Sequence, residues 1–322
     1  MSSDGSGCIL CRGRQEVFLA VDERFSLARC ADCGHVATTP ALPEADLAPF
    51  YPTAYYGARN RRFNLLFERL IVLFRFRRGR LIERRARKGR MLDVGCGRGL
   101  LPYLMRLRGW EAHGLEVSAI AAEHARDVLG VPVHVGRIEE GPWEPGSFEA
   151  VVFWHVLEHV REPRSALRCA RELLSPGGLL VVAVPNFESL QARVGGSVWF
   201  HLDVPRHYHH FGLRVLRRLL DEEGFDVERV SHFALEQNPY GWVQSLLNRT
   251  GLRPNLLYEL LKSESARSSP HPARAWPLQT ALTFLALVPV VPLSAALFLL
   301  ELLLRRGGTV ELCARRRASA PG

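Results

Sequence analysis

The sequence predicts an α/β protein with a parallel, doubly wound sheet. Between residues 90 and 184, short apolar segments of strand type alternate with helical patterns, as they do in consecutive βαβ units. The first of these segments, 91–94, leads directly into Gly95, Gly97 and Gly99, and a helical pattern starts at residue 100. Glycines at a strand-to-helix turn permit positive φ and let a ligand approach the backbone closely. The start of this sheet is therefore the first candidate for a binding site.

The expected elements follow from this alternation. We expect strands at 91–94, 111–115, 133–135, 150–154, 179–184 and 225–231, and helices at 100–108, 118–129, 163–174 and 213–223. Right-handed crossovers between such strands place helices on both faces of the sheet.

Glu116 narrows the choice of ligand at the glycine turn. It ends the second expected strand 21 residues after Gly95, where a carboxylate accepts hydrogen bonds from the ribose of a nucleotide-like cofactor. A dinucleotide site has the pattern G-x-G-x-x-G, whereas the glycines here follow G-x-G-x-G with Asp93 ahead of them. An acidic residue at that position suits a ligand with a positive end better than a pyrophosphate.

Composition and charge set the broad class. The 322 residues are 47% hydrophobic and 23% charged, which is typical of a globular protein, and the formal net charge is +9. The surplus of basic residues favours an anionic partner, such as a phosphorylated substrate, a lipid head group or nucleic acid. No apolar segment precedes residue 15, so we expect no signal peptide and a cytoplasmic location.

Four cysteines near the start of the chain predict a metal site. Cys8 and Cys11 form one C-x₂-C pair, Cys30 and Cys33 form a second, and Gly34 follows in a tight turn. In a reducing compartment, two such pairs close a tetrahedral Cys₄ zinc site. We expect two short strands at 16–20 and 24–28 and a structural zinc ion that folds this ribbon, since four thiolates leave no open position for catalysis.

A basic stretch follows the ribbon. Residues 59–90 contain thirteen arginines and lysines against two glutamates, with apolar residues between them. A helix over 63–78 is either a membrane-surface element or a helix of the main domain with a basic solvated side, and both interpretations stay open. Nucleic acid ranks lower as a partner because no recognition motif accompanies the charge.

The motifs of the central region resemble those of the class I S-adenosylmethionine-dependent methyltransferases. The resemblance rests on the segment Leu92-Asp93-Val94-Gly95-Cys96-Gly97-Arg98-Gly99, on Glu116, and on the segments 147–152, 156–160 and 174–178. It covers residues 89–234 and implies a Rossmann-like seven-stranded sheet whose last strand, at 309–315, is antiparallel. It also implies a role for each of several residues in binding S-adenosylmethionine: Asp93, Gly95, Cys96, Gly97 and Gly99 beside its amino-acid part, Glu116 on its ribose, and Ile138 and Glu139 beside its adenine.

The reactive edge of the sheet follows the strand at 150–154. His155 is a candidate for removing a proton from the acceptor, because an unperturbed imidazole titrates near pH 6.5. Glu158 and His159 resemble the Glu-His pair of ubiquinone-pathway O-methyltransferases, which is implicated in binding a divalent cation. There the first ligand is acidic, whereas this chain has His155. A divalent cation at Glu158 and His159 and a purely structural role of the pair both stay open.

The segment 199–211 is rich in groups that bind a polar acceptor. It supplies His201, Arg206 and His209 as candidate substrate ligands and His207 as a second candidate base. Similar sequences occur in methyltransferases of sugar and cell-surface polymer biosynthesis. We therefore expect a small-molecule substrate, namely a sugar, nucleotide-sugar or lipid-linked glycan. The alternatives are a quinone or other lipid O-methyltransferase at the membrane surface and a non-catalytic cofactor-binding module.

A hydrophobic insertion separates the last two strands. Residues 278–300 contain no charge, and Pro289 and Pro292 divide them into two apolar pieces. Because the last strand returns to the same sheet, we expect a shallow hairpin or pair of helices on the inner face of a membrane, with a buried pair or a dimer interface as the alternative. The expected organisation is a zinc ribbon (1–50), a basic helical linker (51–88), a methyltransferase core (89–234), a hydrophobic helical insertion (235–308) and a last strand with a basic tail (309–322).

Overall fold

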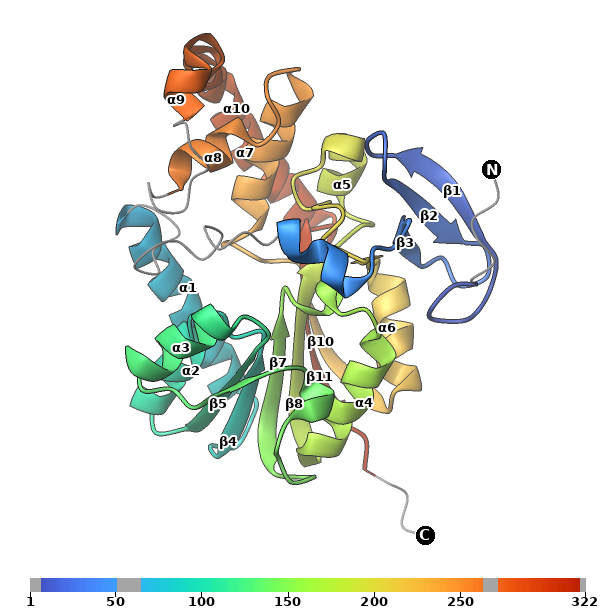
Figure 1. Cartoon of the computed structure of the whole chain (residues 1–322), viewed down its shortest axis with the longest axis vertical. Helices are drawn as coiled ribbons and strands as arrows, with labels where there is room; N and C mark the ends of the chain where they lie inside the picture. The colour runs from blue at the N-terminus through green and yellow to red at the C-terminus, as the bar shows by residue number, and fades with distance from the viewer. Residues whose placement is uncertain (1–6, 51–64, 263–271, 319–322) are drawn as a thin grey trace. The chain divides into compact units, whose positions relative to one another are not determined.

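The computed structural model describes residues 7–50, 65–262 and 272–318 (Figure 1). The chain divides into two compact units. Unit 1 comprises residues 1–65, 185–215 and 231–310, and unit 2 comprises residues 66–184, 216–230 and 311–322. The domain boundaries expected from the sequence instead treat each domain as one continuous stretch of the chain, and they stay a prediction. Residues 51–64 of the expected basic linker lie outside the described residues.

Unit 2 is built on the predicted seven-stranded sheet, in the order β10-β11-β8-β7-β4-β5-β6. Its strands are β4 (Arg90–Val94), β5 (Glu111–Glu116), β6 (Val133–Val135), β7 (Phe148–Trp154), β8 (Leu174–Pro185), β10 (Phe225–Ser231) and β11 (Thr309–Arg316). The pairs β4·β5, β4·β7, β5·β6 and β7·β8 are parallel. The last strand lies between β10 and β8 and runs antiparallel, so the predicted fold class is confirmed.

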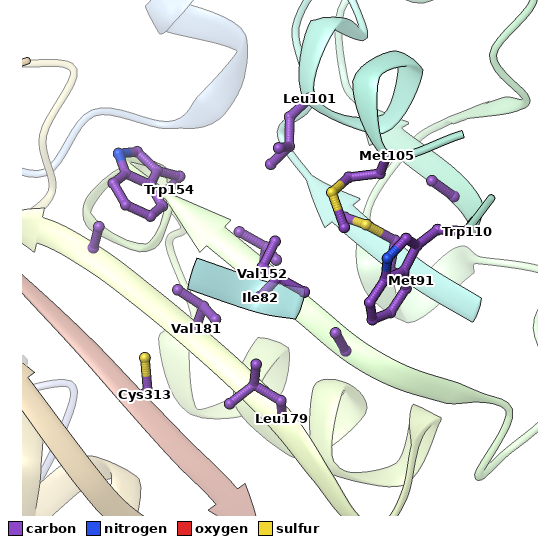
Figure 2. Packing of buried hydrophobic residues seen from close by; sticks show 13 residues of the cluster. Ile82, Met91, Leu101, Met105, Trp110, Val152, Trp154, Leu179, Val181 and Cys313 are labelled. Atoms are coloured by element: carbon purple, nitrogen blue, oxygen red, sulfur yellow. The ribbon is translucent and has the colours of Figure 1, made fainter. Parts of the chain in front are cut away.

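The core of unit 2 explains why these segments form strands. The central strands are buried on both faces, as their continuous apolar sequences require. Figure 2 shows one side of this core, where Met91, Val152, Val181 and Cys313 of four adjacent strands pack together. Met105 from α2 packs onto the same cluster. Burial of these side chains fixes the strands whose ends form the site.

Helices connect the strands of this sheet. They are α1 (Leu65–Glu83), α2 (Leu100–Leu107), α3 (Ala119–Asp127), α4 (Pro163–Leu173) and α6 (Leu213–Glu222), with short 3₁₀ turns at Ile138–Glu140 and Leu157–His159. Each of the predicted helices is present with its ends shifted by at most a few residues.

The basic helix α1 uses its arginines inside the protein. Arg77 pairs with the buried carboxylate of Glu311 at 2.9 Å, and the guanidinium of Arg78 lies 4.1 Å from the ring centroid of Trp154. Glu68 accepts an ion pair from Arg98 of the glycine turn at 2.8 Å. These contacts favour the interpretation of α1 as a helix of the main domain over that of a membrane-surface element.

Unit 1 contains a four-stranded antiparallel sheet in the order β1-β2-β3-β9. Its strands are β1 (Gln15–Ala20), β2 (Ser26–Cys30), β3 (Val36–Thr39) and β9 (His209–His210). Two strands were expected here, but a third follows the second cysteine pair, and a fourth comes from the segment 199–211, with Val36 opposite His210. The expected ribbon is thus part of a sheet that extends into the predicted substrate segment.

The remainder of unit 1 is helical. It contains α5 (Leu190–Gly195), α7 (Asn238–Arg249), α8 (Leu256–Leu261), α9 (Pro272–Ala275) and α10 (Pro277–Leu303), with 3₁₀ turns at Glu44–Phe50 and Gly196–Val198.

The expected division of the hydrophobic insertion at its prolines is wrong. Pro289 and Pro292 both lie inside α10, which is one helix of 27 residues. Each proline removes one backbone hydrogen bond from the helix. Packing holds the helix together across this gap, because Val290 is buried against Leu247 of α7 and Leu257 of α8.

Candidate functional site

The glycine turn of unit 2 has the backbone geometry that its sequence predicts. Gly95, Gly97 and Gly99 have φ angles of 67°, 55° and 77°. A Cβ on Gly95 would lie 2.4 Å from Cγ2 of Val156, so packing requires glycine there. A Cβ on Gly97 would meet no atom of the described residues within 4 Å. The backbone at Gly97 therefore borders open space that a ligand can enter.

Glu116 is fixed beside this turn. Its Oε2 accepts a hydrogen bond from the Gly97 amide at 2.8 Å, and its Oε1 accepts one from the Ser118 amide at 2.9 Å. Burial raises the pKa of Glu116, although both hydrogen bonds oppose the shift. Each carboxylate oxygen accepts more than one hydrogen bond, so the group can also bind a pair of hydroxyls.

Asp93 and Cys96 complete the polar lining of the turn. Burial raises the pKa of Asp93 to about 7, while Arg75 and Arg78 favour its charged form. Burial also raises the pKa of the Cys96 thiol, and the nearby Asp93 and Glu116 raise it further. Cys96 therefore stays a neutral thiol and is unsuited to act as a nucleophile.

The predicted adenine-side residues lie in the 3₁₀ turn at Ile138–Glu140. The side chain of Ile138 is buried and that of Glu139 is exposed. An apolar residue beside a carboxylate suits a planar heterocycle, but the role of these two residues stays a prediction.

His155 lies at the carboxyl end of β7 in a strained conformation. Its φ is 55°, which is uncommon for a residue with a side chain, and its amide donates a hydrogen bond to the carbonyl of Ala183 at 2.8 Å. Its Nδ1 lies 3.3 Å from Oε1 of Glu158, which is 1% exposed. The pair holds the His155 ring in place, whereas a cation at Glu158 and His159 stays a prediction.

The predicted substrate segment lies in unit 1, and several of its side chains contact one another. Asp203 pairs with Arg206, whose Nε donates to Oδ1 at 3.0 Å, and its Oδ2 lies 3.7 Å from Nε2 of His207. The Nδ1 of His207 donates to the carbonyl of His201 at 3.0 Å. The His201 and His207 side chains are buried, and that of Arg206 is half-buried.

His209 is also inside unit 1, where it contacts a histidine that sequence reasoning missed. Its Nδ1 lies 3.1 Å from Nε2 of His35, and the Nδ1 of His35 lies 3.6 Å from Sγ of Cys8. The neighbouring His210 is fully buried, which lowers its pKa to about 3. The sequence signals a role of His35 only through its position two residues after Cys33. Its partner His209 is 174 residues away, so the sequence gives no sign of their contact.

The four cysteines come together as predicted. The Sγ atoms of Cys8 and Cys33 are 3.6 Å apart, those of Cys11 and Cys30 are 3.4 Å apart, and all four lie within 4.8 Å of one another. Sulfur ligands at about 2.3 Å from one zinc ion would be at about this separation. The residue after each pair, Arg12 and Gly34, has positive φ, so both turns have the same geometry.

Comparisons with known proteins identify the family of the chain. A family model described as "Methyltransferase domain" matches residues 62–230. A ubiquinone biosynthesis O-methyltransferase of Chromobacterium violaceum is 30% identical over 177 residues, which cover 51% of this chain and 75% of that protein. Proteins of the same name from Xanthomonas campestris and Cereibacter sphaeroides are 32% and 30% identical, over 38% and 50% of this chain and 54% and 68% of their own lengths.

Solved structures match over a longer part of the chain but less closely. A methyltransferase from Thermotoga maritima described as a possible histamine N-methyltransferase is 18% identical, with a TM-score of 0.46, and the match covers 78% of this chain and 95% of that one. Structural similarity at this sequence identity and TM-score says nothing about the function of the chain.

The family is thus shown by both the family model and the Chromobacterium relative. The open backbone at Gly97, the buried carboxylate of Glu116 and the acidic group of Asp93 fit a nucleoside with a cationic amino-acid end. The chain belongs to the methyltransferase domain family and is a class I S-adenosylmethionine-dependent methyltransferase.

Proposed function

We propose that the protein methylates a hydroxyl group of a lipid, such as a quinone precursor, at the inner surface of a membrane. The relatives named above are O-methyltransferases of ubiquinone biosynthesis, which supports this alternative over a sugar acceptor. One observation within the molecule favours a lipid as the substrate. The buried face of α10 is polar and its exposed face is apolar, which is the reverse of a surface helix in water.

The polar residues of α10 lie on its protein-facing side. Thr280, Thr283, Ser294 and Glu301 are all buried, and Glu301 accepts a hydrogen bond from Nε1 of Trp242 at 2.8 Å. Their spacing of three, eleven and seven residues keeps them on one face of a helix.

Most apolar residues of α10 are exposed, although Val290 is buried. Among them Leu285 is 68% exposed, Val288 is 73% exposed and Leu303 is 82% exposed. A helix on the surface of a water-soluble domain has the opposite arrangement. Among the described helices, α10 also has the length and hydropathy of a membrane span, and only 17% of its most apolar window is buried. Since one flank packs on α7 and α8, we propose that α10 lies along the membrane rather than across it.

The proposed mechanism uses the groups at the carboxyl ends of β4, β5 and β7. S-adenosylmethionine, when bound, supplies a methyl group that is already activated for in-line displacement. Glu116 binds the ribose hydroxyls, and Asp93 pairs with the ammonium group. The main task of the site is then to hold the acceptor oxygen in line, and correct orientation of two reactants saves about 7–11 kcal/mol.

His155 is the proposed general base. Glu158 Oε1 lies 3.3 Å from Nδ1 and favours a proton on that atom, which leaves Nε2 as the acceptor for the proton of the substrate hydroxyl. The strained backbone at His155 aims the ring from the end of β7. His207 is the second candidate, but the hydrogen bond of its Nδ1 to the carbonyl of His201 favours a role in shaping the substrate segment.

The base is tested by a pair of variants. His155→Gln should lower kcat by about 10²–10⁴ and leave the affinity for S-adenosylhomocysteine unchanged, because the glutamine keeps the size but not the basicity of the ring. Glu158→Gln should lower kcat less, since Nε2 remains. An unchanged kcat in His155→Gln would exclude the base.

Product analysis tests the acceptor. The full chain is incubated with methyl-labelled cofactor and either a lipid extract or a soluble sugar and nucleotide-sugar pool, and the labelled product is identified. Label in an ether of a lipid supports the proposal. Label in the soluble pool alone contradicts it and supports a sugar, the second candidate, which the half-buried Arg206 beside Asp203 favours.

Vesicle binding tests α10. Leu285→Gln with Val288→Gln should weaken sedimentation with phosphatidylcholine vesicles several-fold. Leu107→Gln with Val128→Gln is the matched control, because these apolar residues of unit 2 are 67% and 64% exposed but lie outside α10. Equal sedimentation of both variants and the wild type would contradict the membrane role.

We also propose that the four cysteines hold a structural zinc ion. Burial raises the pKa of the Cys33 thiol well above its usual range, so binding the ion would release protons. Zinc content of the purified protein tests this directly.

A further inference from the structure

Unit 1 contains a cavity of about 590 Å³ whose charge is strongly positive. Four arginines line it, Arg29, Arg193, Arg305 and Arg306, against a single carboxylate, Glu188. In the part of the chain that the structure describes, none of the four guanidinium groups lies within 4 Å of a carboxylate. We call this site the arginine cavity.

The backbone holds two of these arginines at fixed positions. The turn after α10 places Arg305 at a φ of 51°. The Arg306 amide donates to the carbonyl of Glu301 at 2.8 Å, and its own carbonyl accepts from the Leu190 amide of α5 at 3.1 Å. The turn is therefore tied to two helices, and the two guanidinium groups extend from a rigid base.

His232 adds a further donor to the lining. Its Nδ1 accepts a hydrogen bond from the Gly307 amide at 3.3 Å, so the proton of the neutral ring is on Nε2. Burial and the nearby Arg305 lower the pKa of His232, which keeps the ring neutral at pH 7. The aromatic wall is formed by Phe18 and Phe187, whose ring centroids are 6.2 Å apart, and the guanidinium of Arg29 lies 4.5 Å from the Phe18 centroid.

We propose that the arginine cavity binds a phosphate or diphosphate group. Arginine recognises phosphate oxygens through paired N–H donors. Four exposed guanidinium groups around one cavity, none of them beside a carboxylate of the described residues, favour an anion of high charge. The volume lies within the range of small-ligand pockets and exceeds what a single phosphate needs. The cavity therefore suits a phosphate that carries a further group.

The position of the cavity indicates the source of that phosphate. Arg305 and Arg306 directly follow Leu303 and Leu304, which are 82% and 53% exposed at the end of α10. A charged cavity at the end of an exposed apolar helix matches a ligand with a phosphate head and a hydrocarbon tail. A membrane lipid head group is thus favoured over a free phosphate compound, and this source alone rests on the proposed membrane role of α10.

The experiment tests the phosphate site and the origin of the phosphate ligand separately. Binding of inorganic diphosphate to the full chain is measured by calorimetry, and sedimentation is measured with vesicles of phosphatidylcholine alone or with phosphatidic acid. Arg305→Gln with Arg306→Gln should weaken diphosphate binding about tenfold or more and remove the gain from phosphatidic acid. Binding to phosphatidylcholine alone should remain.

Matched variants control for charge and folding. Arg84→Gln with Arg87→Gln makes the same change in net charge at two exposed arginines of unit 2 and should behave as the wild type. Arg305→Lys with Arg306→Lys keeps the charge but loses the paired donors, so it should bind with intermediate affinity. Circular dichroism and the melting temperature show whether each variant folds.

Each outcome decides a different point. Arginine-dependent diphosphate binding without a gain from phosphatidic acid supports the site with a soluble phosphate compound as its ligand. Arginine-dependent diphosphate binding together with no binding to phosphatidylcholine vesicles contradicts the membrane role of α10. It still supports the arginine cavity as a phosphate site. Diphosphate binding that is absent in the wild type, or equal in the Arg305→Gln, Arg306→Gln variant, overturns the proposal.

Discussion

The glycine turn of unit 2 and the small sheet of unit 1 are assembled in different ways. We call the latter the zinc sheet (β1, β2, β3 and β9), after the zinc ion proposed at its four cysteines. The turn takes the groups proposed to bind the cofactor from one short segment, 93–99, and from Glu116 on the adjacent strand β5. The zinc sheet combines the segment 8–39 with His209 and His210, which follow more than 160 residues later. A site formed by one local turn is readable as a motif, whereas a site formed by distant pairing is only partly readable.

The two regions also differ in what holds them together. The turn rests on parallel strands with a large apolar core, in which Leu92, Val151 and Val181 are fully buried. The sheet of unit 1 is small, and β1 is mostly exposed. It depends on its cysteines, on the buried His35 and on the pairing with β9.

Removal of the metal should give the largest difference between the regions. A structural zinc site contributes about 10–16 kcal/mol of apparent binding free energy at pH 7, so Cys30→Ser or a strong chelator should unfold the sheet of unit 1. Hydrogen exchange should then increase in β2, β3 and β9 and stay slow in β7. A matched Cys169→Ser variant, which changes a thiol outside the cluster, should have no such effect.

If β2 and β3 keep their protection without metal, the zinc ion is dispensable and the small sheet is stable by its own packing. If β7 also loses protection, the two regions fold as one.

Asp93 should make the cofactor site respond to pH in a way the zinc sheet does not. Its pKa is raised from 3.8 to about 7, so the folded protein holds this proton more tightly than the unfolded chain does. This contribution to stability is full below about pH 4 and is lost as the pH rises through 7, on the order of a few kcal/mol in all. Affinity for S-adenosylmethionine should rise over the same interval, because the ammonium group requires the charged carboxylate.

Thermal unfolding and calorimetry at pH 5 to 8 measure both trends. Asp93→Asn should abolish the dependence of cofactor affinity on pH, and a dependence that survives in this variant would assign it to another group.

Two glycines of the turn should give the smallest and most specific difference. Gly95→Ala places a methyl group against Val156 at positive φ and should destabilise unit 2 by about 1–3 kcal/mol. Gly97→Ala pays only the left-handed strain of about 1–2 kcal/mol, but its methyl group enters the open space at the turn. The second variant should therefore lose proportionally more affinity for S-adenosylhomocysteine than stability.

Melting temperatures and calorimetric affinities of the two variants provide this comparison. Equal loss of affinity and stability in both would show that the space beside Gly97 is not where the cofactor lies.

The hydrophobic insertion shows where sequence reasoning went wrong. Two prolines predicted a break, since each removes a backbone hydrogen bond, but packing against α7 and α8 carries α10 through both. The apolar content of this segment was readable, whereas the burial of Thr280, Ser294 and Glu301 depended on which face meets α7. The composition of a helix does not show which of its faces is buried until the neighbouring elements are known.

Local sequence patterns predicted the family, the seven-stranded sheet, the cofactor motif and the cluster of four cysteines. Each of these is encoded by neighbouring residues, whose periodicity or spacing dictates the local conformation. The folded structure was needed to show that β9 completes the zinc sheet, that Glu158 lies beside His155, and that Arg29, Arg193 and the two arginines after α10 line one cavity. Such contacts join segments that are far apart in the chain, and their side chains carry no local signal of the partners they will meet.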